Sequence, residues 1–204
     1  AWGQDLAELE VDHALTLDFT TPHTDWAQPY AGQKTRVLFF CDGRGTVPRE
    51  AVELMQRFDI EAEAVFWARI VDSSDEHWHG GDIGEQRMLN LLEQKWDCYV
   101  MLGLCIDRMS AEQQYKLLKP VTEGAGLVFV GSDDKRVLKQ ERKLAELPAF
   151  IARGPVGDAY AIGKGRGIRL PGVPDIPYAE GWEVEYDYWQ QRLGRAVLWA
   201  AGHE

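Results

Sequence analysis

The sequence predicts an α/β fold: a three-layer α/β/α sandwich with a mostly parallel, flavodoxin-like sheet, preceded by an extended N-terminal arm. Three observations lead to this prediction. Apolar runs of strand length alternate with amphipathic helical segments, the runs are apolar throughout, and turn-forming residues separate the two kinds of segment. Continuous apolar strands are typical of a sheet covered on both faces, and strand–helix–strand units are right-handed crossovers between parallel strands.

The first 35 residues differ from the rest of the chain. A short apolar–polar alternation gives way to Pro, Thr, His and Gly. We predict that residues 1–35 form an arm packed on the main body, with Trp26 and Tyr30 as its anchors, and that residues 36–204 form one domain. The chain starts at Ala1, which indicates either a removed signal peptide, slightly favouring an extracytoplasmic protein, or a part of a larger protein.

The first half of the domain is predicted to contain three strands and two helices. The strands are "RVLFFC" (36–41), "EAEAVFWARI" (61–70) and "DCYVMLGL" (97–104). The helices cover residues 48–58 and 81–94, because apolar side chains recur there at helical spacing.

The second half continues the alternation. Ser110 and Gln113 form a capping-box pair that opens a helix over 110–121, and "EGAGLVFVG" supplies the next strand. A charged amphipathic helix is expected over 132–147, followed by short strands or a hairpin in the Gly- and Pro-rich segment 148–178. A last helix is expected over 184–202. Its predicted core-facing residues are Tyr188, Leu193, Val197 and Leu198.

Composition limits the classes of partner. The chain has 204 residues and a formal net charge of -11, and such a field repels phosphate backbones, so we expect no nucleic-acid partner. No apolar run approaches the roughly 20 residues of a membrane helix, so we expect no integral membrane segment. The 3 cysteines lack paired spacing and indicate neither a disulfide framework nor a zinc site. We expect a homo-oligomer or other domains of a larger protein as partners.

Ligands of doubly wound sheets bind at the carboxyl ends of the strands, so candidate site residues are sought there. Cys105 in "GLCID" partly matches a nucleophile elbow, but Asp107 replaces its second glycine and a nearby carboxylate raises a thiol pKa. The alternative is a small buried residue that ends a strand. In "CDGRG", Arg44 could hold an anion as a bidentate donor, with surface solvation as the alternative. Asp42, Arg44 and Asp134 are the candidate ligand-binding residues of the strand-end loops.

Two further segments carry candidates. The segment 72–82, "DSSDEHWHGGD", contains His77 and His79, whose H-x-H spacing puts both rings on one side of an extended chain. They are candidate ligands of a divalent metal or general bases, and a solvated loop is the alternative; no other cofactor is expected. "GKGRG" (163–167) precedes no helix, so a hairpin turn is favoured over a phosphate-binding loop.

Aromatic residues gather near the C-terminus. Tyr178, Trp182 and Trp199 accompany "YDYW" (186–189), and such rings can stack on a sugar or pack the terminal helix. The pattern alone leaves both roles open.

Several motifs together resemble one superfamily. They are "TRVLFFCDGRG", "WDCYVMLGL", "MSAEQQYKLLKPVTEGAGLVFVGS", "GKGRGIRLPG" and "YWQQRLGRAVLWAAG". From about Lys34 to Gly202 the chain resembles the class I glutamine amidotransferase-like superfamily. It is most similar to non-amidotransferase members such as trehalose-utilisation-type domains and the trimerisation-type domain of some β-galactosidases.

The resemblance implies where a catalytic cysteine would stand. The elbow of catalytic members follows the strand in "EGAGLVFVG", so the matching residue is Ser132, and Asp134 replaces a glycine of the pattern. Cys105 then lies one strand too early. The late His-x-Glu pair of the family is missing around "YAEGWEVEYDY", and His203 is the only late histidine.

The sequence therefore predicts a domain without the Cys-His-Glu triad, because a hydroxyl without a base is a poor nucleophile. Glutaminase activity is not expected, and the expected role is a non-catalytic binding or assembly module. The alternative is an uncharacterised hydrolase, metal-dependent or not, that uses His77 and His79 together with Asp42, Asp107 or Ser132. A third hypothesis has Cys105 or Ser132 as a covalent nucleophile.

Overall fold

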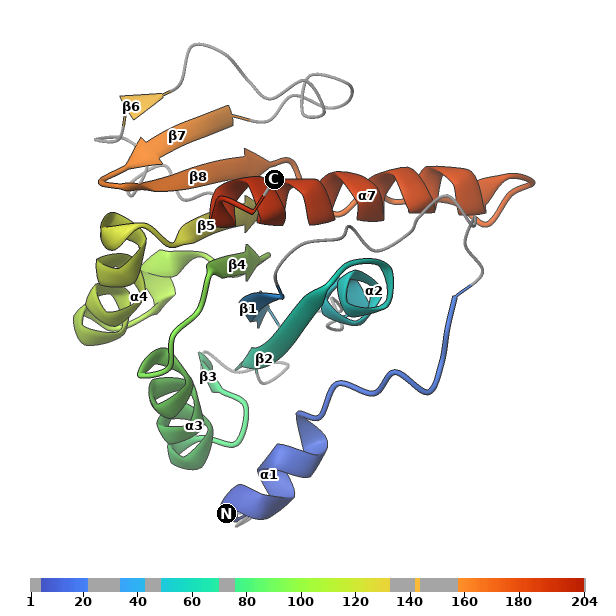
Figure 1. Cartoon of the computed structure of the whole chain (residues 1–204). Coiled ribbons are helices and arrows are strands. Elements are labelled where there is room, and N and C mark those ends of the chain that lie inside the picture. The colour runs from blue at the N-terminus through green and yellow to red at the C-terminus, as the bar shows by residue number, and fades with distance from the viewer. Residues whose placement is uncertain are drawn as a thin grey trace.

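The computed structural model describes residues 5–21, 34–42, 49–69, 76–132, 142–143 and 158–203. Its elements, labelled in Figure 1, are α1 (Leu6–Asp12), β1 (Thr35–Asp42), α2 (Arg49–Arg57), β2 (Ile60–Arg69), β3 (Glu76–Trp78), α3 (Asp82–Leu92), β4 (Cys98–Leu102), the short 3-10 helix η1 (Ile106–Arg108), α4 (Ala111–Glu123), β5 (Gly126–Val130), β6 (Arg142–Lys143), β7 (Asp158–Ile162), β8 (Gly165–Leu170) and α7 (Trp182–Ala201). The alternation of strands and helices between β1 and β5 follows the prediction from the sequence.

Parallel strands form the centre of the sheet. Its 8 strands lie in the order β3-β2-β1-β4-β5-β8-β7-β6, and neighbours from β2 to β8 pair in parallel. Antiparallel strands complete both edges, β3 beside β2 and the β7–β6 pair beside β8. Among the parallel strands, β1 lies between β2 and β4, so the first strand stands between the second and the third, as in flavodoxin-like sheets. The predicted fold class is confirmed.

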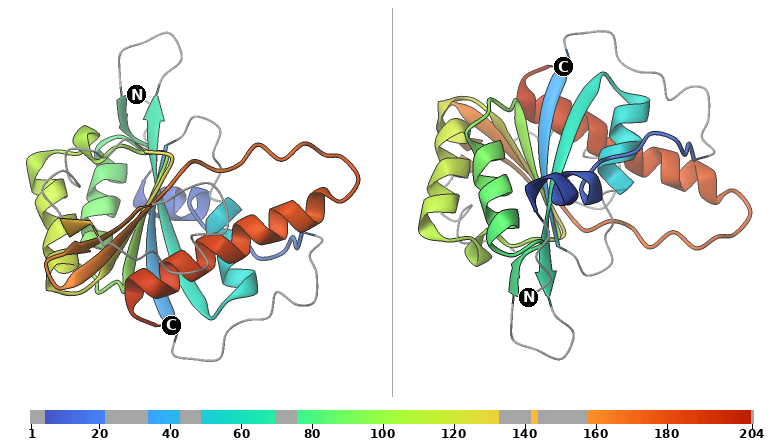
Figure 2. Two further views of the ribbon diagram at one scale, coloured as in Figure 1. Left: turned by 90° about the horizontal axis from the view of Figure 1, so that it is seen from above. Right: turned by 90° about the horizontal axis from the view of Figure 1, so that it is seen from below.

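Alternate residues of β1 show the layers on either side of the sheet. Val37 and Phe39 pack in a buried cluster with α2 and α7, whereas Leu38 and Phe40 pack in a second cluster with α3 and α4. Figure 2 shows the same division, with α2 and α7 on one side of the sheet and α3 and α4 on the other. The central strand is apolar on both faces because both faces are covered.

Two local predictions are borne out in detail. The Ser110 hydroxyl accepts a hydrogen bond from the Gln113 N–H, and the Gln113 side chain accepts one from the Ser110 N–H, which is the predicted capping box of α4. The β7–β8 hairpin turns at Gly163, where φ is +58°. A Cβ at Gly165 would lie 2.2 Å from the Val121 carbonyl oxygen, so only glycine lets the hairpin approach α4 this closely.

The terminal helix is present, with one difference in its buried face. Leu193, Val197 and Leu198 are buried, as predicted. Tyr188 is exposed, which corrects our expectation that it faces the core. The buried stripe of α7 runs through Trp189, Leu193 and Val197 at four-residue spacing, and Tyr188 lies about 100° around the helix from Trp189.

The N-terminal arm is not extended throughout, since it contains helix α1. A capping box opens this helix: Asp5 accepts from the Glu8 N–H at 2.9 Å, and Glu8 accepts from the Asp5 N–H. Leu9 of α1 is fully buried, and it lies so close to Gly80 that a Cβ there would be 2.7 Å from Leu9 Cδ1. Local capping in a short segment produced a helix where the composition indicated an extended chain.

Arg87 of α3 connects the arm to the sheet. Its guanidinium binds Glu10 of α1 at 2.8 Å and Glu63 of β2 at 3.0 Å, and it donates to the carbonyl oxygen of Ala64 at 2.8 Å. The expected anchors Trp26 and Tyr30 lie outside the described residues.

The charged helix predicted over 132–147 is wrong at Arg142 and Lys143. These residues form β6, which pairs antiparallel with Tyr160 and Ala161 of β7. The free edge of the hairpin supplies backbone partners for this short strand, an interaction that helical periodicity in the sequence does not encode. Residues 133–141 and 144–147 lie outside the described residues. In the described part of the chain, none of the helices is long and apolar enough to cross a membrane.

Candidate functional site

Ser132 and Cys105, the two candidate nucleophiles, follow adjacent parallel strands. Ser132 comes after β5 across a sharp turn in which Gly131 has a φ of +69°. A Cβ at Gly131 would lie 2.9 Å from the Cα of Gly172, so the turn depends on glycine. Ser132 is only 7% exposed, whereas Cys105 is partly exposed at the start of η1. Strand β5 therefore ends in a tight glycine turn that leads into Ser132.

The hydrogen bonds described for the histidine rings join His79 to His13 and His203 to Thr35. His77 and His79 belong to the β3 edge, and a strand spacing of about 4.8 Å puts β3 roughly 19 Å from β5. The ring of His203 hydrogen-bonds the hydroxyl of Thr35 at 2.8 Å. Thr35 is the first residue of β1, so His203 lies at the amino-terminal ends of the parallel strands, whereas Ser132 lies at their carboxyl ends.

The other predicted strand-end residues are only partly described. Asp42 ends β1 and is partly exposed, and Asp107 is exposed within η1. Arg44 and Asp134 lie outside the described residues, so the ligand-binding role expected for them stays a prediction.

His77 lies on an unexpected short strand, and His79 follows directly after its last residue. Residues predicted as a loop form β3, in which His77 pairs with Ala68 of β2. The Nδ1 atom of His79 is 2.8 Å from Nε2 of His13, a buried residue at the end of α1. Among the described residues, no three His, Cys, Asp or Glu side chains form a metal-binding group. The histidine that approaches His79 comes from the arm, where the sequence gave no sign of a contact.

Glu76 of β3 has partners that sequence reasoning missed. Its carboxylate forms an ion pair with Arg108 of η1 and accepts a hydrogen bond of 3.3 Å from the indole N–H of Trp67. The pair ties the edge strand to the loop that follows β4. Because this carboxylate and this guanidinium bind each other, we assign them a structural role.

Cys41 and Cys98 are structural. Both are fully buried within β1 and β4, and burial raises the pKa of both thiols far above its ordinary value. Neither thiol is therefore a source of thiolate at neutral pH.

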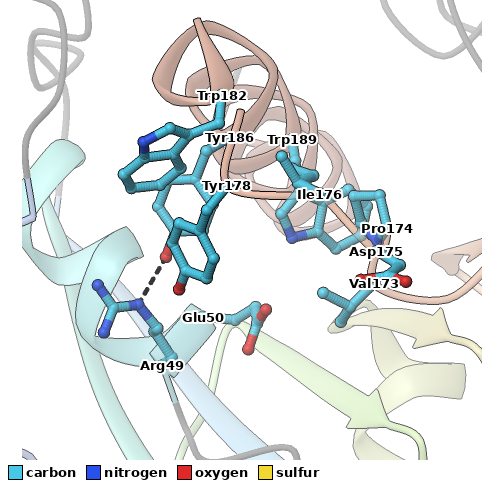
Figure 3. A pocket seen from close by; sticks show the side chains of 10 residues that line it. All are labelled: Arg49, Glu50, Val173, Pro174, Asp175, Ile176, Tyr178, Trp182, Tyr186 and Trp189. Carbon is cyan, nitrogen blue, oxygen red and sulfur yellow. Dashed lines mark hydrogen bonds between the residues drawn. The ribbon is translucent and has the colours of Figure 1, made fainter. Parts of the chain in front are cut away.

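A pocket of about 340 Å³ lies beside the strand ends, between the first turn of α2, the segment after β8 and the N-terminal half of α7 (Figure 3). Its aromatic wall consists of Tyr178, Trp182, Tyr186 and Trp189. The Tyr178 and Trp182 ring centroids are 5.0 Å apart, in an edge-to-face contact. Of the aromatic residues singled out in the sequence, these four meet at a cavity, while Trp199 is buried against the sheet.

Glu50 forms the polar floor of this pocket. The residue is only 5% exposed, and burial raises the pKa of its carboxyl group. The backbone N–H of Glu50 and the nearby indole of Trp189 act in the opposite direction and lower that pKa. The Trp189 N–H is buried and has no hydrogen bond of good geometry with any described residue. In Figure 3 it faces the Glu50 carboxylate.

A buried ionic network supports one side of the pocket. Arg57 binds Glu53 at 3.0 Å and Asp187 at 2.6 Å, which joins α2 to α7. Glu53 also binds Arg49 at 3.3 Å and accepts from the Tyr186 hydroxyl at 3.0 Å. Burial raises the pKa of Tyr186 to about 12, so this hydroxyl stays protonated at neutral pH.

No protein-family model matches the sequence, and the search of curated proteins finds no similar protein. The chemistry of the site therefore rests on its own residues. Sequence reasoning missed Arg49, Glu50 and Trp189 as a set. The only available signal was a charged first turn in the helix that follows the first strand.

Proposed function

We propose that this chain is a non-catalytic binding or assembly module, a divergent relative of the class I glutamine amidotransferase-like superfamily without the Cys-His-Glu triad. The observation that carries the proposal is the distance between Ser132 and the histidines. Ser132 follows a glycine turn after β5, whereas His77 and His79 lie at the β3 edge, roughly 19 Å away by strand spacing, and His203 hydrogen-bonds Thr35 at the start of β1. A serine hydroxyl needs a base to accept its proton before it can attack a carbonyl group.

Three features support a binding role. The central strand order is that of a flavodoxin-like sheet, in which ligands bind at the carboxyl ends of the strands. A pocket with an aromatic wall lies near the carboxyl ends of β1 and β8, and its volume is in the range of small-molecule sites. Its polar residues include no described nucleophile–base pair.

The test is a search for turnover with matched variants. Purified protein is assayed for ammonia release from glutamine and for hydrolysis of chromogenic esters, phosphoesters and glycosides, beside Ser132→Ala and Cys105→Ala. We expect no turnover above the buffer rate and no difference among the three proteins. Turnover that is lost in either variant would contradict the proposal and favour the hydrolase alternative.

A further inference from the structure

The pocket between α2 and α7 holds carboxylates that lack a cationic partner. Within the described chain, neither Glu50 nor Asp175 forms an ion pair. Arg49 also lines the pocket, and its charge lowers the pKa of Glu50, but its guanidinium binds Glu53 and donates to the Tyr186 hydroxyl at 2.8 Å. A buried carboxylate without a cation is costly, so the pocket gains free energy from a ligand that carries positive charge.

The surroundings of the pocket strengthen its attraction for cations. Glu180 precedes α7, and Glu183 and Glu185 lie in its first turn, next to the aromatic wall. The chain as a whole carries a net charge of -11. Together these charges raise the local concentration of cations and repel anionic ligands.

The aromatic wall suits an alkylammonium group. Ring faces attract cations, most strongly those that shed their water easily. The guanidinium of Arg49 already lies 5.8 Å from the ring centroid of Tyr186. Tyr178 and Trp182 extend the wall beyond this contact, and Figure 3 shows the Tyr178 ring near Glu50 and Trp182 farther from it.

Trp189 places a hydrogen-bond donor beside Glu50. Its buried indole N–H lines the pocket and faces the Glu50 carboxylate. An ammonium group cannot accept a hydrogen bond, but a hydroxyl oxygen on the same ligand can share this N–H with the carboxylate. A hydroxyl group does so without adding negative charge beside Glu50.

We propose that the pocket binds a small amino alcohol, whose ammonium group pairs with Glu50 and packs on Tyr178 and Trp182, and whose hydroxyl oxygen accepts from Trp189. This assignment rests on the proposed role as a binding module and specifies its ligand. The aromatic residues alone also suggested a neutral sugar, but a sugar has no positive charge to pair with the Glu50 carboxylate.

The experiment compares choline with its uncharged carbon isostere, 3,3-dimethyl-1-butanol, by isothermal titration calorimetry at low ionic strength, with tryptophan fluorescence as a second readout. We expect saturable choline binding, and binding of the isostere weaker by about 10-fold or more. Glu50→Gln keeps the shape of the side chain and should weaken choline binding by a similar factor. Glu123→Gln, at an exposed position at the end of α4, is the matched control and should bind as the unmodified chain does.

Three results would overturn the assignment. They are equal affinity for choline and the isostere, unchanged choline affinity in Glu50→Gln, and no choline binding up to about 10 mM, a limit below which even weak sites show saturation. A parallel titration with glucose separates the two proposals. Glucose binding without choline binding would overturn the amino alcohol and leave the binding module standing, whereas hydrolytic turnover would overturn the module itself.

Discussion

Two regions at the carboxyl ends of the strands differ in the side chains that they bring together. In the turn after β5, Gly131 has a positive φ and Ser132 follows it, while the described histidines lie at the β3 edge or beside Thr35. The pocket between α2 and α7 matches no familiar motif, yet it brings a buried carboxylate, an indole N–H and three further rings together. At the carboxyl ends of the strands, a tight backbone turn and a group of side chains able to bind a ligand therefore occur at different places.

The difference has a physical origin. An elbow is a local feature, set by a few consecutive residues and their backbone angles. A set of reacting or binding side chains depends on segments that only the fold brings together, as Glu50 and Trp189 show. A local turn can therefore form whether or not distant segments supply the side chains of a site.

The largest expected effect concerns the framework below the pocket. Asp187→Ala leaves Arg57 buried beside Glu53 with half of its pairing lost, and breaking a buried pair in this way costs about 3–5 kcal/mol. Urea denaturation should show a large drop in the unfolding midpoint. Lys116→Ala, which breaks a surface pair with Glu93, is the control and should leave the midpoint unchanged. Equal unfolding midpoints for the two variants would show that the ion pair between Arg57 and Asp187 does not stabilise the packing of α2 against α7.

The second prediction concerns the thiols. Cys105 is partly exposed, whereas Cys41 and Cys98 are fully buried and have raised pKa values. In native protein, iodoacetamide should modify Cys105 at least about 100-fold faster than the other two, which react only after opening of the core. Peptide mass spectrometry over a time course measures the three rates. Faster labelling here follows from access alone, so it does not by itself indicate a catalytic thiol; comparable rates at all three would contradict the buried placement of β1 and β4.

The third prediction tests Glu50 by pH. Because the folded-state pKa of Glu50 is raised, folding favours its protonated form. Its stabilising contribution is present below the unfolded pKa, about 4.3, and is lost as the pH rises through the folded value. Glu50→Gln should therefore raise Tm modestly at pH 7 and leave it unchanged near pH 4. A lower Tm at pH 7 would indicate that the ionised carboxylate stabilises the fold.

The smallest effect is expected at the β3 edge. His79→Ala removes the hydrogen bond to His13 and should cost about 1 kcal/mol of stability. Choline binding should be unaffected, since this contact lies near the edge of β2 rather than between α2 and α7. Thermal unfolding and calorimetry measure the two quantities. Loss of choline binding with stability retained would connect this edge to the ligand site.

Features with local or periodic causes were predictable from the sequence. The continuous apolar runs gave β1 and β4, the Ser110–Gln113 pair gave the start of α4, and the glycine pair at 163–165 gave the hairpin. Each depends on neighbouring residues or on a short repeat in hydrophobicity. The parallel order then follows from the crossovers.

Features with long-range causes were not predictable in this way. β3 and β6 are short strands that form because an edge offers backbone partners. The contact of His79 with His13 joins the arm to the sheet, and the pocket brings together Glu50 and Trp189, which lie far apart in the sequence. No pattern in a single sequence marks such pairs.

The most direct test of the central claim is a side-by-side choline titration of two proteins by calorimetry. One is the double variant Cys105→Ala/Ser132→Ala, which removes both candidate nucleophiles, and the other is Glu50→Gln. If the ligand binds in the pocket between α2 and α7, the double variant binds choline as the unmodified chain does, and Glu50→Gln binds it at least about 10-fold more weakly. Normal binding by Glu50→Gln together with weakened binding by the double variant would contradict the account.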